Sequence, residues 1–558
     1  MRNQNWTRIS LLFLLLLTGL GLATVSDYGS SWDENIRMQA GDVKLDYYQS
    51  LLSADWEKAR EIAAKADNYP GFFDLNLALL REFFPVSDIL TGHVFSLAFG
   101  LVAVAGAMRM AGLLGGSRAA FLTGLVLALT PSFYGHMFIN PKDIPFACGY
   151  IWGLYWIAVW IRQWPRPETR TILLAGLCIG IAMATRVGGL ILLCYLGLFI
   201  LTAWGINLGR GAYASNGEAL TALLRRQILP ATGVAVLSFL VLALYWPSLH
   251  GNPFGRTGET LQATARYAWD MPVLFEGVQL TAGQLPWYYI LKMLLLKIPA
   301  GFLLLFAGGC FLSILVMKRG GVRHALRDTL PRLLVLFSIF FPFGYVIVRD
   351  STLYNGIRHL IFILPPAAVL CGLAADRALE ILKDRADSFR TAVIGLSAAY
   401  CLLLAFTGLR LHPYQYIYYN EIAGGVARAQ EDYETDYWGT AYRELAESFY
   451  DFLVSTRASF NRPYVVVNME HVTWLFEPYL PAESKLPIHV LRSRPQDDDF
   501  YAATPLWNAD RFYHGRPVVT IERMGVPLGV VKDRRGLSPE ERGFGYAPDF
   551  SAGQNGPD

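Results

Sequence analysis

Two adjacent carboxylates, Asp33 and Glu34, follow the first apolar run of the chain and are its first candidates for chemistry. Carboxyl groups in unequal surroundings acquire different pKa values, so that one can act as a general base while the other orients the site or holds a cation. A pair of solvated charges in a loop would give the same sequence. The pair alone leaves both interpretations open.

A second polar motif, His136-Met-Phe-Ile-Asn140-Pro-Lys142-Asp143, separates two apolar runs. Asn140 and Pro141 favour a turn. At a membrane surface Lys142 can bind a lipid phosphate, and Asp143 can bind a metal ion or a sugar hydroxyl. The alternative is that Lys142 only extends its ammonium group to the membrane–water interface and that Asp143 caps the next helix.

Two further cationic sites lie beside apolar runs. Arg186 is the only charged residue between positions 171 and 209, and an arginine in such a stretch usually faces a polar cavity. Arg358 and His359 end the segment Tyr354-Asn-Gly-Ile-Arg358-His359. A guanidinium binds phosphate through two parallel hydrogen bonds, and an adjacent imidazole can add a donor. An anchor at the membrane surface is the alternative for this segment.

The elements that must position these residues are membrane helices. The chain of 558 residues is 53% hydrophobic and only 17% charged, and a helix of about 20 apolar residues crosses a hydrocarbon core. Runs without Asp, Glu, Lys or Arg predict about eleven transmembrane helices. These runs are 9–26, 89–108, 119–139, 144–161, 171–185, 187–209, 227–249, 298–317, 333–348, 360–375 and 391–409.

The basic residues predict the orientation of these helices. Lys and Arg gather in alternate connections, such as 318–332 and 377–390, which are therefore expected to be cytoplasmic. This pattern requires two helices, with a tight turn at Arg186, in the stretch 171–209. The protein is then a multi-pass protein of the plasma (inner) membrane with a cytoplasmic N-terminus. All the candidate residues lie at the outer surface.

Three regions follow from this topology. Residues 1–410 form a membrane module with outer loops 27–88 and 250–297, residues 411–535 form a small extracytoplasmic α/β domain, and residues 536–558 are expected to be disordered. The domain is expected to hold a helix at 440–456 and strands at 463–468, 488–491 and 517–521. Four tyrosines at its start suit an aromatic belt at the membrane surface: Tyr414, Tyr416, Tyr418 and Tyr419.

Several functional classes are not indicated. The cytoplasmic connections are short, and neither a phosphate-binding G-x-x-x-x-G-K-[ST] motif nor a dinucleotide-binding G-x-G-x-x-G motif after a strand is present. No nucleotide cofactor and no nucleic-acid partner are therefore expected.

In their order along the chain, the polar motifs resemble those of a known family. Asp33-Glu34, Asn140-Pro-Lys-Asp143, Ala184-Thr-Arg186 and Gly356-Ile-Arg358-His359 resemble the GT-C membrane glycosyltransferases. The resemblance is to the dolichyl-phosphate-mannose protein mannosyltransferases and their bacterial relatives, and covers most of 1–410. The segments Tyr418-Tyr-Asn-Glu421 and Asp436-Tyr-Trp-Gly439 look like the start of the outer domain in a bacterial branch.

The resemblance implies a transferase that moves a sugar, usually with inversion, from a polyprenyl-phosphate donor to an acceptor outside the cytoplasm. Asp33 would be the general base. Glu34 would orient the site or, with Asp143, help to hold a divalent metal cation. The phosphate of the leaving lipid would be neutralised by Lys142, Arg186, Arg358 and His359.

The acceptor stays open. The protein mannosyltransferases carry His-Pro-Pro after their acidic pair, whereas this chain reads Asn68-Tyr-Pro-Gly-Phe-Phe-Asp74, and loop 250–297 is too short for inserted sugar-binding repeats. A lipid, a glycan or a protein is therefore possible as acceptor. The alternative function is a transporter or flippase of lipid-linked sugars, which would show discontinuous helices and charges accessible from both faces.

The charge pattern predicts that a reporter fused after residue 415 is active only outside the cytoplasm, because the positive connections hold the opposite ends of the helices inside. Activity of paired cytoplasmic and extracytoplasmic reporters measures this. A cytoplasmic position would overturn the placement of every candidate residue.

Overall fold

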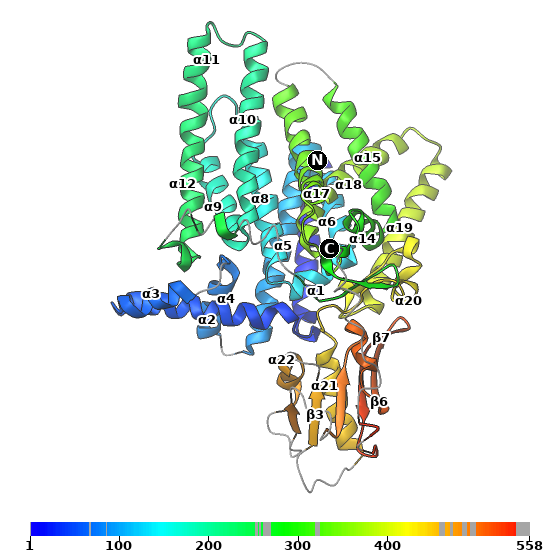
Figure 1. Ribbon diagram of the computed structural model, residues 1–558. Helices are drawn as coiled ribbons and strands as arrows, with labels where there is room; N and C mark the ends of the chain where they lie inside the picture. The colour runs from blue at the N-terminus through cyan, green and yellow to red at the C-terminus, as the bar shows by residue number, and fades with distance from the viewer. Residues whose placement is uncertain are drawn as a thin grey trace, which may run out of the picture.

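The computed structural model describes residues 2–65, 69–84, 86–251, 255, 258–260, 269, 271–318, 324–456, 464–468, 473–481, 488–491, 498–538 and 540–542. Most of the predicted tail 536–558, part of loop 250–297 and Asn68 lie outside these residues. The protein consists of a tall bundle of helices with a small sheet domain at one end (Figure 1).

Among the described residues, nine helical segments are long and apolar enough to cross a membrane. Their main helices are α1 (Arg2–Thr24), α5 (Asp88–Gly115), α8 (Asp143–Arg162), α10 (Ile191–Gly209), α12 (Leu229–Leu244), α15 (Ala300–Met317), α17 (Leu330–Val348), α18 (Leu364–Leu382) and α19 (Asp387–Arg410).

The membrane-protein fold class is confirmed, whereas the number of eleven spans is not. Each of the eleven apolar runs is mostly helical, but two of them do not form a single long helix. Run 119–139 forms α6 (Ser117–Ala128) and α7 (Pro131–Ile139), which are bent by 73° relative to each other. Run 171–185 forms α9 (Thr169–Thr185), which has only 17 residues. Eleven spans result only if the bent pair is one span and α9 is another.

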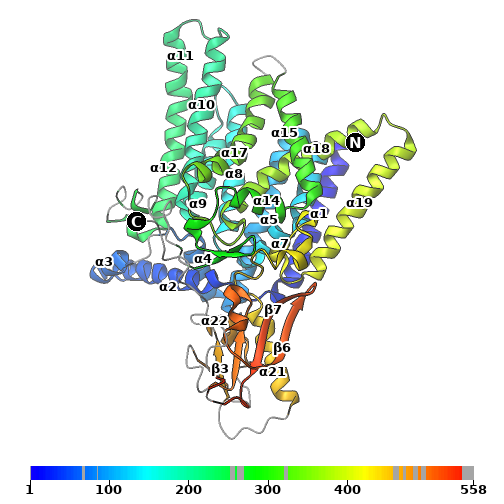
Figure 2. The same cartoon turned by 45° about the vertical axis from the view of Figure 1, so that its right-hand side comes forward.

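Four helices outside the nine long apolar segments lie near the end of the bundle that carries the sheet domain. They are α2 (Trp32–Leu52), α3 (Trp56–Lys65), α4 (Phe72–Phe83) and α14 (Tyr289–Lys297). In both views α2 and α3 run crosswise to the bundle, whereas α11 (Asn216–Leu223) lies at the opposite end (Figures 1 and 2). The segments that bear the candidate residues therefore share one side of the bundle.

The soluble region contains a five-stranded sheet of order β4-β3-β5-β7-β6. Strand β3 (Tyr464–Asn468) pairs in parallel with β4 (Ile488–Leu491) and β5 (Phe500–Ala503), and β7 (Val526–Asp533) is antiparallel to β5 and β6 (Arg516–Arg523). Helix α21 (Tyr442–Ser455) packs against β6 and β7 through its apolar face. The helix and three strands expected from the sequence are all present.

The predicted aromatic belt is wrong. Tyr414, Tyr416, Tyr418 and Tyr419 are each at most 3% exposed. Three of their hydroxyls have partners inside the protein: Tyr414 donates to Glu444 (2.8 Å), Tyr416 donates to Asp436, and Tyr419 donates to the backbone oxygen of Glu434. A buried tyrosine needs such a partner, and the soluble domain supplies it.

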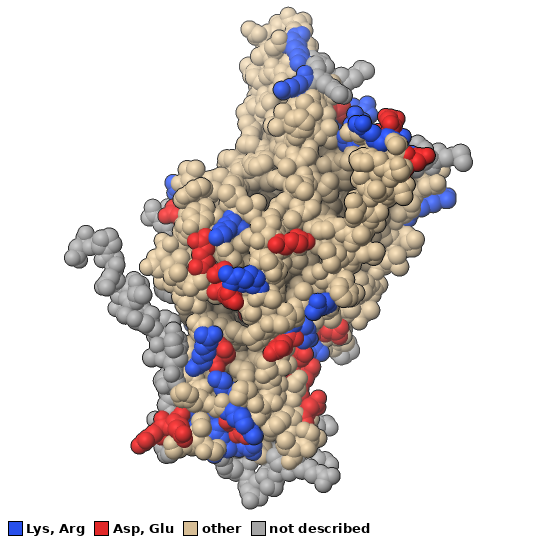
Figure 3. All heavy atoms as spheres, turned by 90° about the vertical axis from the view of Figure 1, so that its right-hand side faces the viewer, with Lys and Arg blue, Asp and Glu red and all other residues tan. Residues whose placement is uncertain are grey.

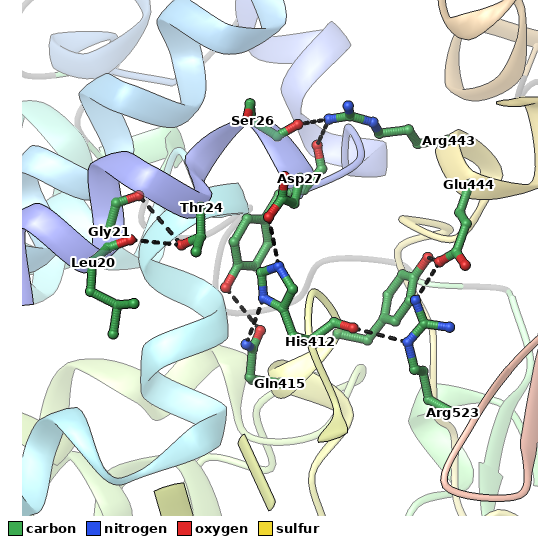
Figure 4. Close-up of polar contacts among 12 residues, drawn as sticks. Leu20, Gly21, Thr24, Ser26, Asp27, His412, Gln415, Arg443, Glu444 and Arg523 are labelled. Carbon is green, nitrogen blue, oxygen red and sulfur yellow. Dashed lines mark hydrogen bonds and ion pairs between the residues drawn. The ribbon is translucent and has the colours of Figure 1, made fainter. Parts of the chain in front are cut away.

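Polar contacts attach the soluble domain to the exit of α1 (Figure 4). Arg443 of α21 donates to the backbone oxygens of Ser26 and Tyr28. His412 contacts Asp27 at 2.9 Å, and its backbone oxygen accepts from Arg523 at 2.9 Å. Arg523 also pairs with Glu444 at 2.6 Å. The contacts of Arg443 and His412 with residues 26–28 fix the domain against the membrane module, whereas those of Arg523 lie within the domain.

The surface agrees with this division. On the face drawn in Figure 3, uncharged side chains cover much of the helical part, and charged side chains are denser over the soluble domain at the bottom. Lipid-facing helices carry few charges because charges in hydrocarbon are costly.

Candidate active site

The first turn of α2 positions the acidic pair. The Glu34 carboxylate accepts the backbone N–H of Ser31 (2.6 Å), and the Ser31 hydroxyl donates to the backbone oxygen of Ile139 at the end of α7 (2.8 Å). These bonds cap the helix and place it beside the turn that follows α7. Glu34 is buried against His93 (3.1 Å), whereas Asp33 faces a cavity.

The turn after α7 positions Lys142 and Asp143. The amide oxygen of Asn140 accepts the backbone N–H groups of Lys142 (3.2 Å) and Asp143 (2.8 Å), and its amide nitrogen donates to the Asp143 carboxylate (3.0 Å). Asp143 also pairs with Arg186, which follows the last residue of α9. Asp143 thus holds Arg186 in place at the head of α8.

Most of the candidate residues line one cavity of about 330 Å³ between one end of the bundle and the soluble domain. Of the residues predicted from the sequence, Asp33, Lys142, Arg186, Arg358 and His359 line it, and Glu34 and Asp143 do not. The other lining residues are Trp32, Ile36, Arg37, Tyr69, Trp269, Tyr354, Asn355, Tyr437, Trp438, Leu506 and Trp507.

Asp33 lies between two cations. Its Oδ2 atom is 3.3 Å from Nη1 of Arg358 and 4.0 Å from Nζ of Lys142. Burial acts to raise the pKa of Asp33, but Lys142, Arg358, Arg37 and Arg186 together lower this pKa well below its usual value. For Lys142 burial has the opposite effect: it lowers the pKa to about 8, although the nearby Asp33 acts to raise it.

Several nitrogen atoms at the cavity are buried without a hydrogen-bond partner among the described residues. They are Nε of Arg186, Nε of Arg358, Nδ1 of His359 and Nε1 of both Trp269 and Trp438. A buried polar atom without a partner costs about 1–3 kcal/mol. A ligand rich in oxygen atoms would supply the missing acceptors.

The sequence reasoning missed Arg37, Tyr69 and Asp74. Arg37 lies one helical turn after Asp33 and pairs with Asp74 at 3.2 Å. The ring of Tyr69 lies under Nζ of Lys142 (5.2 Å) and under the guanidinium of Arg37 (5.8 Å). Arg37 could have been predicted from its spacing of four residues from Asp33, because residues four apart on a helix lie on the same face.

The two carboxylates predicted as metal ligands do not form a metal site. Glu34 is engaged by His93 and by the N–H of Ser31, and Asp143 is engaged by Arg186 and Asn140. Within the described part of the chain, no three His, Cys, Asp or Glu residues are grouped as metal ligands. This donor set therefore does not fit a bound cation.

Comparison with known proteins finds a family that matches part of the chain. Residues 76–224 match a family model described as "Dolichyl-phosphate-mannose-protein mannosyltransferase". The match confirms the resemblance of the sequence motifs. It includes Lys142, Asp143 and Arg186, whereas Asp33 and Arg358 lie outside it. No curated protein matches the chain.

Two solved structures resemble the whole chain. One is ArnT from Cupriavidus metallidurans bound to undecaprenyl phosphate, with 14% identity over 95% of this chain and 98% of that chain and a TM-score of 0.48. The other is the archaeal oligosaccharyltransferase AglB from Archaeoglobus fulgidus in complex with an inhibitory peptide and a dolichol-phosphate. Its identity is 11%, over 96% of this chain and 75% of that chain, with a TM-score of 0.45.

The pKa of Lys142 predicts how anion binding depends on pH. Lys142 is charged below about pH 8 and neutral above it. The affinity for undecaprenyl phosphate, used as a probe, should therefore fall by about tenfold between pH 7.5 and 9.5. Arginine keeps its charge over this range, so Lys142→Arg should remove most of the decrease. Equal decreases in both proteins would show that Lys142 does not contact the anion.

Proposed function

We propose that the protein transfers a sugar from a polyprenyl-phosphate donor to an acceptor hydroxyl on the extracytoplasmic side, with inversion and with Asp33 as general base. The observation that carries the proposal is the placement of one carboxylate against Arg358 and Lys142 at the same cavity. A base and a set of phosphate-binding cations are the two components that this reaction requires.

The cations and the buried nitrogen atoms support a phosphate-linked donor. Arg186, Arg358 and His359 each have a buried nitrogen without a partner among the residues that the structure describes, and Lys142 lies at the same cavity. Charge-assisted hydrogen bonds to phosphate oxygens would satisfy these atoms. The same groups stabilise the negative charge that grows on the phosphate as the bond between the sugar and the lipid breaks.

An apolar groove supports a polyprenyl chain on this phosphate. The groove has a volume of about 330 Å³ and lies between α14, α15, α17 and α18. Leu294, Phe302, Phe343 and Ile363 are among its lining residues. The short helix η7 (Arg358–Ile363) joins the two sites, because its first residue faces the polar cavity and its last lines the groove. A lipid phosphate has this division into a charged and an apolar part.

The ion pairs of Asp33 connect donor binding with activation of the base. Without donor, Arg358 and Lys142 keep the pKa of Asp33 low, so Asp33 is a weak base. A donor phosphate attracts the same cations and thereby restores the basicity of Asp33. Asp33 then takes the proton of the acceptor hydroxyl, the acceptor oxygen bonds to C1 of the sugar from the opposite face, and the C1–O bond to phosphate breaks.

Glu34 and Asp143 act as positioning residues in this mechanism. Glu34 fixes the start of α2 through the N–H of Ser31, and hence the direction of Asp33. Asp143 holds Arg186.

One observation favours the transporter alternative, which predicts discontinuous helices: the bend of 73° between α6 and α7. Purified protein in liposomes distinguishes the two functions. A transferase releases polyprenyl phosphate from a panel of polyprenyl-phosphate sugars when lipid, glycan or peptide acceptors are offered. A transporter moves the intact lipid-linked sugar between leaflets and cleaves no bond.

Substitution of the base should separate binding from turnover. Asp33→Asn keeps the shape of the side chain but removes the proton acceptor, so turnover should fall by about 10²–10⁴-fold. Because the competing carboxylate is lost, undecaprenyl phosphate should bind at least as tightly as to the wild type. Asp350→Asn, an exposed change on the same side, is the control. Near-normal turnover of Asp33→Asn would refute the mechanism.

The proposed leaving-group role of Arg358 is tested by Arg358→Ala. Loss of a group that contacts the transition-state charge should lower kcat/KM for the donor by about 10²–10³-fold. Arg349→Ala removes an exposed arginine from the same connection and should behave as the wild type. Thermal unfolding in detergent checks that the Arg358 variant is folded. If it turns over saturating donor normally, Arg358 is only a structural residue.

A further inference from the structure

The soluble domain contributes aromatic residues to the cavity of the membrane module. Leu506 and Trp507 of η11 (Leu506–Arg511) line the cavity from this domain. Trp507 has φ 58° and ψ 23°, and Asn508 has φ 59° and ψ 25°. Asparagine tolerates this left-handed conformation, whereas a tryptophan there costs about 1–2 kcal/mol. Such a cost indicates that the position of the Trp507 ring matters.

The Trp507 ring is fixed beside the proposed base. Its Nε1 atom donates to the backbone oxygen of Pro272 (2.9 Å), and its ring lies edge-to-face with Trp32 at a centroid distance of 6.1 Å. Trp32 immediately precedes Asp33, and its backbone N–H donates to the backbone oxygen of Trp438 (3.1 Å). The contacts of Arg443 and His412 with the membrane module hold the rest of the domain (Figure 4). Trp507 is therefore a fixed part of the cavity wall.

The aromatic wall adjoins the proposed phosphate site. The guanidinium carbon of Arg358 is 5.0 Å from the ring centre of Tyr354 and 5.3 Å from that of Trp438. Trp269 stacks on Tyr354 at 4.0 Å. Trp32, Trp269 and Trp507 are only half-buried, so each keeps apolar ring surface available in the cavity.

These surfaces fit the sugar of the donor. A sugar whose C1 is bonded to a phosphate at Arg358 has to lie against the neighbouring wall. The C–H face of a sugar ring packs on an indole, and the positive charge that the ring gains in the transition state is attracted to an aromatic face. The hydroxyl groups at the edge of the ring can meet Asn355 and Arg37.

We propose that Trp507, together with Trp32, clamps the sugar ring of the donor, so that the soluble domain determines which monosaccharide the enzyme accepts. The ligand class is a single pyranose or furanose linked through phosphate to a polyprenyl chain. This inference rests on the proposed function and assigns the soluble domain a part in donor selection.

The test compares two lipids, undecaprenyl phosphate and an undecaprenyl-phosphate sugar that the wild type turns over. Trp507→Ala should weaken binding of the sugar-linked lipid by about three- to tenfold and leave that of undecaprenyl phosphate unchanged. Trp507→Phe keeps an aromatic face and should lose less. Trp474→Ala is the matched control, because Trp474 contacts Trp32 at 5.7 Å from the same domain but lines a different cavity.

The remaining outcomes separate the two proposals. Equal weakening of both lipids by Trp507→Ala, no weakening of either, or the same loss in Trp474→Ala overturns the clamp and leaves the transferase intact. If the wild type turns over no polyprenyl-phosphate sugar, the proposed function itself is overturned, and the clamp with it. Trp507→Phe serves as the folded variant if Trp507→Ala unfolds at a lower temperature.

Discussion

Charges withdrawn from water at the membrane surface have to compensate one another, and the arrangement of this protein follows from that constraint. Arg358 is 5% exposed and Asp143 is 3% exposed, so either charge would be costly there without a partner. Asp33 pairs with Arg358 and Lys142, and Asp143 pairs with Arg186. Each ion pair also joins segments far apart in the sequence. The helix ends are thus held together by the groups that are proposed to do the chemistry.

Most of the charged residues that the sequence singled out line the same cavity. Lys142, Arg186 and Arg358 were found because a charge beside an apolar run is conspicuous, and the orientation rule placed all three on one side. The direction of Glu34 could not be predicted in the same way. It depends on α2 starting at Trp32, because neighbouring residues on a helix point about 100° apart. Had the helix begun one residue later, Glu34 would occupy the position that Asp33 now has.

Features that depend on contacts between distant segments could not be predicted from the sequence. The tyrosines from Tyr414 to Tyr419 have the local pattern of an interfacial belt, but α21 and its neighbours bury them. Tyr69 and Trp507 reach the cavity from loops and short helical turns, where no periodicity indicates direction. Hydropathy located the helices, but it could not tell whether 117–139 is one straight span or a bent pair.

Under the proposed function, the apolar groove has a consequence for how the protein meets its donor. Leu291, Leu295 and Phe340 line it and remain 38%, 43% and 49% exposed, so it opens sideways on the helical surface. A polyprenyl lipid that enters there arrives by diffusion within the plane of the bilayer. Saturation is then governed by the mole fraction of donor among the lipids, and the bulk concentration has no direct influence. Dilution of the donor with inert lipid acts on this enzyme as dilution in water acts on a soluble one.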